Sequence, residues 1–125
     1  MSVIIIGAGQ AGLQSIVSLR QSGYTQAITL IGDEAYLPYQ RPPLSKAYLS
    51  GKMERDRVFL KPETFFTENN VTLKLDTRVA SLDAGAKTVA LESGESLAYE
   101  DLIIATGSRP RRLDLPGRDL GNIFD

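Results

Sequence analysis

The sequence reads Val3-Ile4-Ile5-Ile6-Gly7-Ala8-Gly9-Gln10-Ala11-Gly12 close to its N-terminus. A short continuous run of β-branched residues is typical of a strand that is buried in a parallel sheet. The glycines follow at the spacing G-x-G-x-x-G, where Gly7 permits a tight turn, Gly9 lets backbone approach a pyrophosphate, and Gly12 lets a helix pack closely on the strand. We therefore predict a strand, a phosphate-binding turn and a helix over these residues.

The pattern continues as the helix and a second strand. Apolar residues between positions 13 and 19 recur at helical spacing, and Gly23 is placed to end the helix. The N-terminus of such a helix directs free N–H groups and the positive end of its dipole at a bound anion. Residues 26–31 then predict the second strand.

This second strand ends at Gly32-Asp33-Glu34. In dinucleotide-binding folds, an acidic residue about 20 positions beyond the glycines accepts hydrogen bonds from the adenosine ribose. We assign this role to Asp33 first and to Glu34 second; the alternative is a solvated turn that carries two acids. A carboxylate here repels a 2′-phosphate, so the site favours FAD or NAD over NADP.

Composition restricts the class of protein. A length of 125 residues fits one domain, and 14 Lys and Arg against 15 Asp and Glu give no global positive field for nucleic acid or an anionic membrane. The apolar stretch near the N-terminus is too short for a bilayer and no cation precedes it, so we expect a cytoplasmic protein without a membrane anchor. Cys and His are absent, so we expect no disulfide, no thiolate nucleophile and no metal site.

The chain then departs from a simple dinucleotide-binding half. Residues 36–49 form a long loop with two cations around two prolines, and we expect a short helix there that ends before Gly51. A second helix is predicted over residues 62–69, with its two phenylalanines in the core rather than stacked on a flavin. A strand over residues 71–75 follows.

The remainder predicts a meander and one more buried strand. Short alternating segments at 79–82, 88–91 and 97–99 are separated by turn residues, which is typical of an antiparallel meander. Residues 102–105 again have the pattern of a buried parallel strand. The predicted fold class is therefore α/β, a Rossmann-like parallel sheet with an inserted antiparallel β-meander.

Four motifs occur in order: the glycine loop, Gly32-Asp33-Glu34, Arg41-Pro42-Pro43-Leu44-Ser45-Lys46-Ala47-Tyr48-Leu49, and Ala105-Thr106-Gly107-Ser108-Arg109-Pro110-Arg111. Together they resemble the N-terminal part of bacterial FAD-dependent ferredoxin reductases, the putidaredoxin-reductase-like enzymes of cytochrome P450 and ring-hydroxylating dioxygenase systems. The Arg41 to Lys46 motif is the specific part, because the glycine loop and the Ala-Thr-Gly motif are shared by a wider two-dinucleotide flavoprotein superfamily. The resemblance implies that residues 1–110 belong to an FAD-binding domain and that residues 111–125 are a crossover toward an NADH-binding domain.

The resemblance also implies contacts with FAD. The glycine loop would lie against the pyrophosphate, Asp33 would hold the ribose, and Val79 would contact adenine through its backbone. Arg41 and Lys46 would lie along the cofactor, with Lys46 as the catalytic residue near the isoalloxazine; the alternative is a basic exposed loop. The implied cofactor-binding residues are Gly7, Gly9, Gln10, Ala11, Gly12, Asp33, Glu34, Arg41, Lys46, Val79, Ala105, Thr106 and Gly107.

For function, the resemblance implies that NADH gives hydride to FAD and that electrons pass singly to a [2Fe-2S] ferredoxin. The missing cysteines argue against the disulfide reductases and the coenzyme A-disulfide reductases of the superfamily. Rubredoxin and monodehydroascorbate reductases remain alternatives, and so does a nucleotide-binding module without turnover. Because these residues contain a single phosphate loop, we expect residues 1–125 alone not to oxidise NADH.

Overall fold

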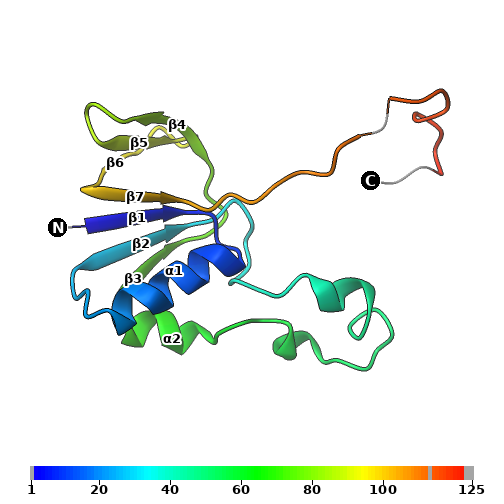
Figure 1. Cartoon of the computed structure of the whole chain (residues 1–125), viewed down its shortest axis with the longest axis horizontal. Helices are drawn as coiled ribbons and strands as arrows, with labels where there is room; N and C mark the ends of the chain where they lie inside the picture. The colour runs from blue at the N-terminus through cyan, green and yellow to red at the C-terminus, as the bar shows by residue number, and fades with distance from the viewer. Residues whose placement is uncertain (1, 113, 123–125) are drawn as a thin grey trace.

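A computed structural model of the chain describes residues 2–112 and 114–122. It contains a four-stranded parallel sheet with the strand order β3-β2-β1-β7 and a three-stranded antiparallel sheet with the order β4-β5-β6 (Figure 1). The antiparallel strands are inserted in the sequence before the last parallel strand. The predicted α/β fold with an inserted meander is therefore confirmed.

Each predicted strand is present, and each of its two ends lies within one residue of the predicted position. The parallel strands are β1 (Ser2–Ile6), β2 (Ala27–Ile31), β3 (Val71–Lys74) and β7 (Asp101–Ile104). The antiparallel strands are β4 (Val79–Asp83), β5 (Thr88–Leu91) and β6 (Ser96–Ala98). The α-helices are α1 (Gln10–Gln21) and α2 (Glu63–Glu68), and two short 3₁₀ helices are η1 (Pro42–Ser45) and η2 (Arg55–Arg57).

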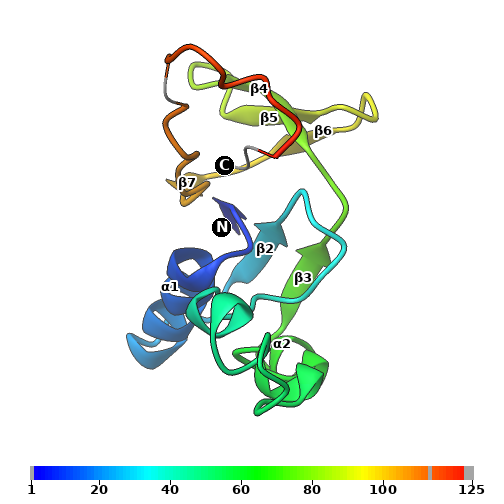
Figure 2. The same ribbon diagram turned by 90° about the vertical axis from the view of Figure 1, so that its right-hand side faces the viewer.

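The parallel sheet lies between two apolar layers. Successive strand residues point to opposite faces of a sheet, so β1 contributes to both layers. Val3 and Ile5 pack with residues of α1 and α2, including the buried Phe66, whereas Ile4 packs with Val89 and other residues of the meander. Figure 2 shows the two helices on one face of the sheet and β4, β5 and β6 on the other. Burial on both faces explains why β1 is a continuous apolar run.

Helix α1 is held in place at both of its ends. Near its N-terminus, a Cβ on Gly12 would overlap the carbonyl oxygen of Gly7, so only glycine permits this close approach. Near its C-terminus, the guanidinium of Arg20 donates to the carbonyl oxygens of Tyr24 at 2.6 Å and Asn69 at 2.9 Å. These bonds join the end of α1 to the chain before β2 and to the end of α2.

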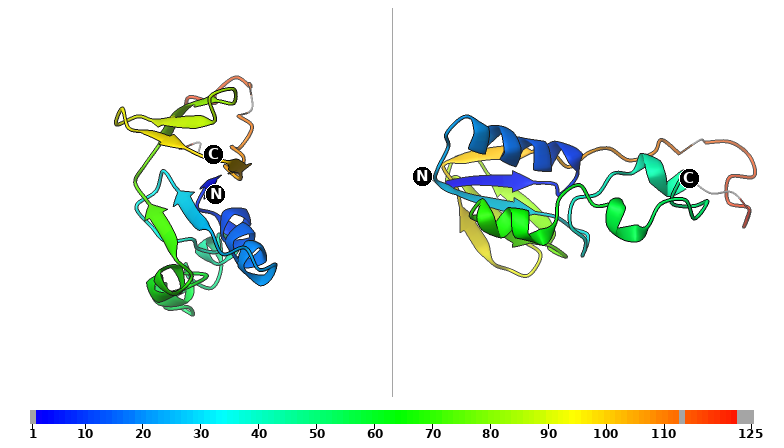
Figure 3. Two further views of the ribbon diagram at one scale, coloured as in Figure 1. Left: turned by 90° about the vertical axis from the view of Figure 1, so that its left-hand side faces the viewer. Right: turned by 90° about the horizontal axis from the view of Figure 1, so that it is seen from below.

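The segment between β2 and α2 differs from the prediction. A single short helix was expected there, but η1 ends at Ser45 and hydrogen-bonded turns continue to Gly51, followed by η2. The turn is tight because the carbonyl oxygen of Pro43 accepts from the N–H groups of both Lys46 and Tyr48, at 3.0 and 2.9 Å. This segment projects from one end of the sheet (Figure 3).

After β7 the chain leaves the sheet and runs beyond it (Figure 1). Residues 113 and 123–125 lie outside the described residues, so the crossover expected over 111–125 is described only in part, and the boundary at residue 110 stays a prediction. None of the helices in the described part of the chain combines the length and the apolar character needed to cross a membrane.

Candidate functional site

The ends of three parallel strands meet at one edge of the sheet. The N–H of Gly7 donates to the carbonyl oxygen of Ile31 at 2.8 Å, and the N–H of Ala105 donates to that of Ile6 at 2.7 Å. The segments that follow β1, β2 and β7 are therefore held side by side. In open α/β sheets, ligands bind outside the carboxyl ends of the strands, at this position.

Two adjoining hollows lie there, with volumes of about 400 and 430 Å³. They share residues of all three segments, including Gly7, Asp33 and Thr106, and so form one groove. Each hollow has the size of an ordinary small-molecule site, and the pair suits an elongated ligand. Ten predicted site residues line the first hollow: Gly7, Gly9, Gln10, Ala11, Asp33, Glu34, Arg41, Ala105, Thr106 and Gly107.

The first glycine of the loop is required by the fold. Gly7 has a φ of +115°, and a Cβ on it would overlap the backbone of Ala105. Its backbone conformation and its contact with the end of β7 both exclude a side chain. Gly7 and Gly12 thus allow the loop to pack closely against the end of β7 and against helix α1.

Gly9 differs, because nothing in the described part of the chain requires it to be glycine. Its φ and ψ of −95° and −165° are open to any residue, and a Cβ on it would have no neighbour within 4 Å. Gly9 lines the groove and is the N-cap of α1, which has no side-chain cap. The first N–H groups of a helix have no partners within the helix. A loop without a side chain at this point, with free N–H groups beside it, fits a pyrophosphate.

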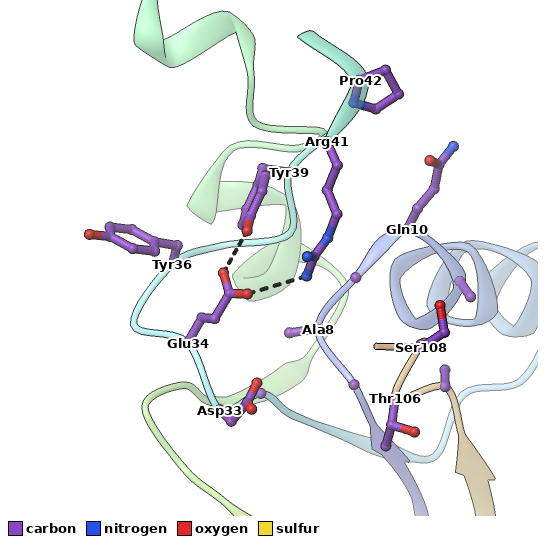
Figure 4. Close-up of a pocket in the computed structure, with 16 residues that line it drawn as sticks. Ala8, Gln10, Asp33, Glu34, Tyr36, Tyr39, Arg41, Pro42, Thr106 and Ser108 are labelled. Atoms are coloured by element: carbon purple, nitrogen blue, oxygen red, sulfur yellow. Dashed lines mark hydrogen bonds and ion pairs between the residues drawn. The ribbon is translucent and has the colours of Figure 1, made fainter. Parts of the chain in front are cut away.

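The two adjacent carboxylates have different surroundings (Figure 4). Glu34 accepts a hydrogen bond from the Tyr39 hydroxyl at 2.7 Å. It also accepts a hydrogen bond from Nη2 of Arg41 at 3.2 Å, and this contact is an ion pair. Asp33 is exposed and makes no hydrogen bond or ion pair with the described residues. Asp33 is thus the carboxylate of this pair that remains available to a ligand.

The hydrogen bond to Glu34 also changes the acidity of Tyr39. It raises the pKa of the Tyr39 hydroxyl above 10.0, because the carboxylate holds the phenolic proton, and burial acts in the same direction. The positive charge of Arg41 opposes the shift. Tyr39 therefore remains a hydrogen-bond donor throughout the neutral pH range.

Three predicted site residues do not line the first hollow. Val79 lines the second hollow, beside Thr77, whose N–H donates to the carbonyl oxygen of Gly32 at 2.8 Å. Gly12 is buried beneath the loop. Lys46 is exposed at the end of η1 and lines neither hollow, so the structure does not bring it together with the other predicted residues.

Comparison with known proteins identifies the family of the chain. The family model for pyridine nucleotide-disulphide oxidoreductases matches residues 1–125. The chain belongs to the pyridine nucleotide-disulphide oxidoreductase family. Enzymes of this family use FAD and NAD(H). The 125 residues nevertheless contain no cysteine, so they supply no disulfide of their own.

Relatives within the family are electron-transfer reductases. The chain is 46% identical to rubredoxin-NAD(+) reductase of Pseudomonas putida over 98% of its length, and 45% identical to rhodocoxin reductase of Rhodococcus erythropolis over 98%. Among solved structures, the ferredoxin reductase for the CYP199A2 system of Rhodopseudomonas palustris is 44% identical, with a TM-score of 0.88 over 98% of this chain and 30% of that one. The chain spans 32% and 29% of the length of the two reductases.

The structure of this family member also adds lining residues that were not among the predicted contacts. These are Ala8, Gly32, Tyr36, Tyr39, Pro42 and Ser108. Tyr39 is the informative one, because it bonds to a predicted residue, Glu34. No spacing rule for loops connects the two positions, since the chain bends between them.

Proposed function

We propose that the chain forms the FAD-binding part of an NADH-dependent reductase that passes electrons from NADH to a [2Fe-2S] ferredoxin of a P450 or dioxygenase system in the cytoplasm. The observation that carries this proposal is the groove, with a phosphate loop that has no side chain at Gly9 and a carboxylate at Asp33 that has no partner among the described residues. Relatives named rhodocoxin reductase and putidaredoxin reductase, 45% and 37% identical, support the choice of partner.

Each part of the groove has a proposed role toward FAD. The N–H groups at the start of α1 would bind the pyrophosphate, and Asp33 would accept hydrogen bonds from the ribose hydroxyls. Arg41 lines both hollows, and its planar guanidinium suits a phosphate. Val79 would face the adenine from the second hollow.

FAD, when bound, supplies the chemistry that takes up two electrons and releases them singly. The protein contributes position and charge. Lys46 would stabilise negative charge at the isoalloxazine, and this assignment rests on the resemblance of the Arg41 to Lys46 motif, since Lys46 lines neither hollow. Residues 1–125 alone are expected not to oxidise NADH, because a second nucleotide must be held against the flavin and these residues have one phosphate loop.

A rubredoxin reductase is the second candidate. It is favoured by the identities of 46% and 44% to two rubredoxin-NAD(+) reductases. The test uses the full-length protein, loaded with FAD and supplied with NADH, and offers a [2Fe-2S] ferredoxin and a rubredoxin in separate assays. Faster reduction of the ferredoxin supports the first proposal, and faster reduction of the rubredoxin replaces it with the second.

A further inference from the structure

Three side chains at the rim of the groove contact one another pairwise (Figure 4). Tyr39 and Arg41 bind different oxygens of Glu34, Oε2 at 2.7 Å and Oε1 at 3.2 Å. The guanidinium carbon of Arg41 also lies 5.5 Å from the centroid of the Tyr39 ring, within the range of a cation–π contact. We call Glu34, Tyr39 and Arg41 the Glu34 bracket.

Backbone contacts hold the chain at each member of the bracket. Tyr39 forms an antiparallel bridge with Phe59, and its neighbours extend this pairing, since the N–H of Gln40 donates to the carbonyl oxygen of Val58 at 2.9 Å. The carbonyl oxygen of Glu34 accepts from the N–H of Asp76 at 3.0 Å. The backbone of Arg41 is hydrogen-bonded as well, since its carbonyl oxygen accepts from the N–H of Leu44 at 3.0 Å, but its side chain is 72% exposed, against 42% for Glu34. The contacts with Glu34 and Tyr39 therefore restrain a long and largely exposed arginine side chain.

We propose that Glu34 is a positioning residue, which acts on the bound dinucleotide through Arg41 and not as a ribose ligand. This inference rests on the proposed function. Arg41 donates to Glu34 through Nη2, while Nε and Nη1 make no hydrogen bond with the described residues and remain available to a phosphate. An exposed arginine loses rotamer freedom when it binds, and the bracket removes part of this loss before the ligand arrives.

The charges of Glu34 and Arg41 also support a positioning role for Glu34. A carboxylate beside a diphosphate would weaken binding by repulsion, but the ion pair with Arg41 offsets the charge of Glu34. Asp33 has no such partner among the described residues. The two neighbouring acids thus differ in role: Asp33 is available for the ribose, and Glu34 holds an arginine.

The test is a double-mutant cycle on the dissociation constant of FAD, measured by quenching of flavin fluorescence in the full-length apoprotein. We expect Glu34→Gln to weaken binding by about 2- to 10-fold, the range for immobilising one long side chain. In the Arg41→Met background, the same substitution should have no further effect. Tyr39→Phe should follow the same pattern, and it provides the test if Glu34→Gln does not fold. Asp33→Asn is the matched control, which should weaken binding by the same factor in both backgrounds.

Two outcomes would overturn the inference alone. An equal loss from Glu34→Gln in both backgrounds would make Glu34 a direct ligand, and tighter binding by Glu34→Gln would mean that repulsion dominates. Failure of the wild-type protein to bind FAD is a different result, because it would overturn the proposed function and the inference together.

Discussion

The two sides of the groove are built in different ways. On the side of residues 7–12, the ligand would meet backbone. A side chain at Gly7 or Gly12 would overlap other parts of the protein, and a side chain at Gly9 would enter open space. On the side of residues 33–41, it would meet side chains, and the chain that carries them is held by Asp76 at Glu34 and by residues 58–60 at positions 38–40. The first side therefore offers backbone that glycines keep clear, and the second offers side chains held by contacts between distant parts of the chain. Substitutions on the two sides should therefore fail in different ways.

The largest effect is expected from Gly9→Val. The side chain would enter the groove where the pyrophosphate is proposed to lie, so FAD binding should be lost. The apoprotein should keep its stability to within about 1 kcal/mol, since valine accepts the backbone conformation and only the preference for glycine at an N-cap is lost. Flavin content and thermal unfolding of the apoprotein measure the two quantities.

Gly12→Val is the matched control for this prediction. Its side chain would overlap the carbonyl oxygen of Gly7 and meet Leu30, so it should destabilise the fold itself. Normal flavin content in Gly9→Val would remove the glycine loop from the site.

Asp33→Ala tests the side-chain side of the groove. A hydrogen bond to a charged group is worth about 1.5–3 kcal/mol, so FAD binding should weaken by roughly one to two orders of magnitude. The folded apoprotein should be unaffected, because Asp33 has no hydrogen-bond or ion-pair partner among the described residues. A titration with FAD in which Glu34→Ala costs far more than Asp33→Ala would reverse the two assignments.

Lys46→Met concerns the residue that the structure leaves outside the groove. We expect normal FAD content and flavin reduction by NADH that is slower by up to about tenfold, equivalent to roughly 1.4 kcal/mol. Stopped-flow absorbance of the full-length protein measures this rate. An unchanged rate and flavin potential would assign Lys46 to a solvated loop.

The smallest effect is a shift in the alkaline titration of Tyr39. Its pKa is raised above 10.0 by the bond to Glu34, so the absorbance difference between wild type and Tyr39→Phe should show a midpoint above that value. The contribution of this bond to stability is full below pH 10 and is lost as pH rises through the raised pKa. Glu34→Gln should lower the midpoint, and a midpoint that does not respond to Glu34→Gln would show that the bond is absent in solution.

Much of the fold could be predicted because its signals are local. The run from Val3 to Ile6 is apolar at successive positions because helices cover one face of β1 and the meander covers the other. Strand β7 has the same pattern, yet Ile104 is 62% exposed, because β7 lies at the edge of the described sheet. A strand pattern predicts the strand but does not distinguish a central strand from an edge strand.

The residues of the candidate site also differ in whether a local sequence signal indicates them. Gly7, Gly9 and Asp33 were predictable because the chemistry of a phosphate loop and a ribose acid fixes their spacing along the chain. Tyr39 was not, because its hydroxyl reaches Glu34 only through the bend after β2 and the bridge to Phe59. Such contacts join residues through space, and no periodicity in the sequence records them.

Every role proposed above requires that this groove bind FAD through the glycine loop. The most direct measurement is the visible absorbance spectrum of the purified full-length protein, compared with that of Gly9→Val prepared in the same way. We predict the bands of a bound flavin in the wild type, at one flavin per chain, and their absence in the variant. A wild-type protein that is colourless and takes up no added FAD, or a variant that holds as much flavin as the wild type, would contradict the account.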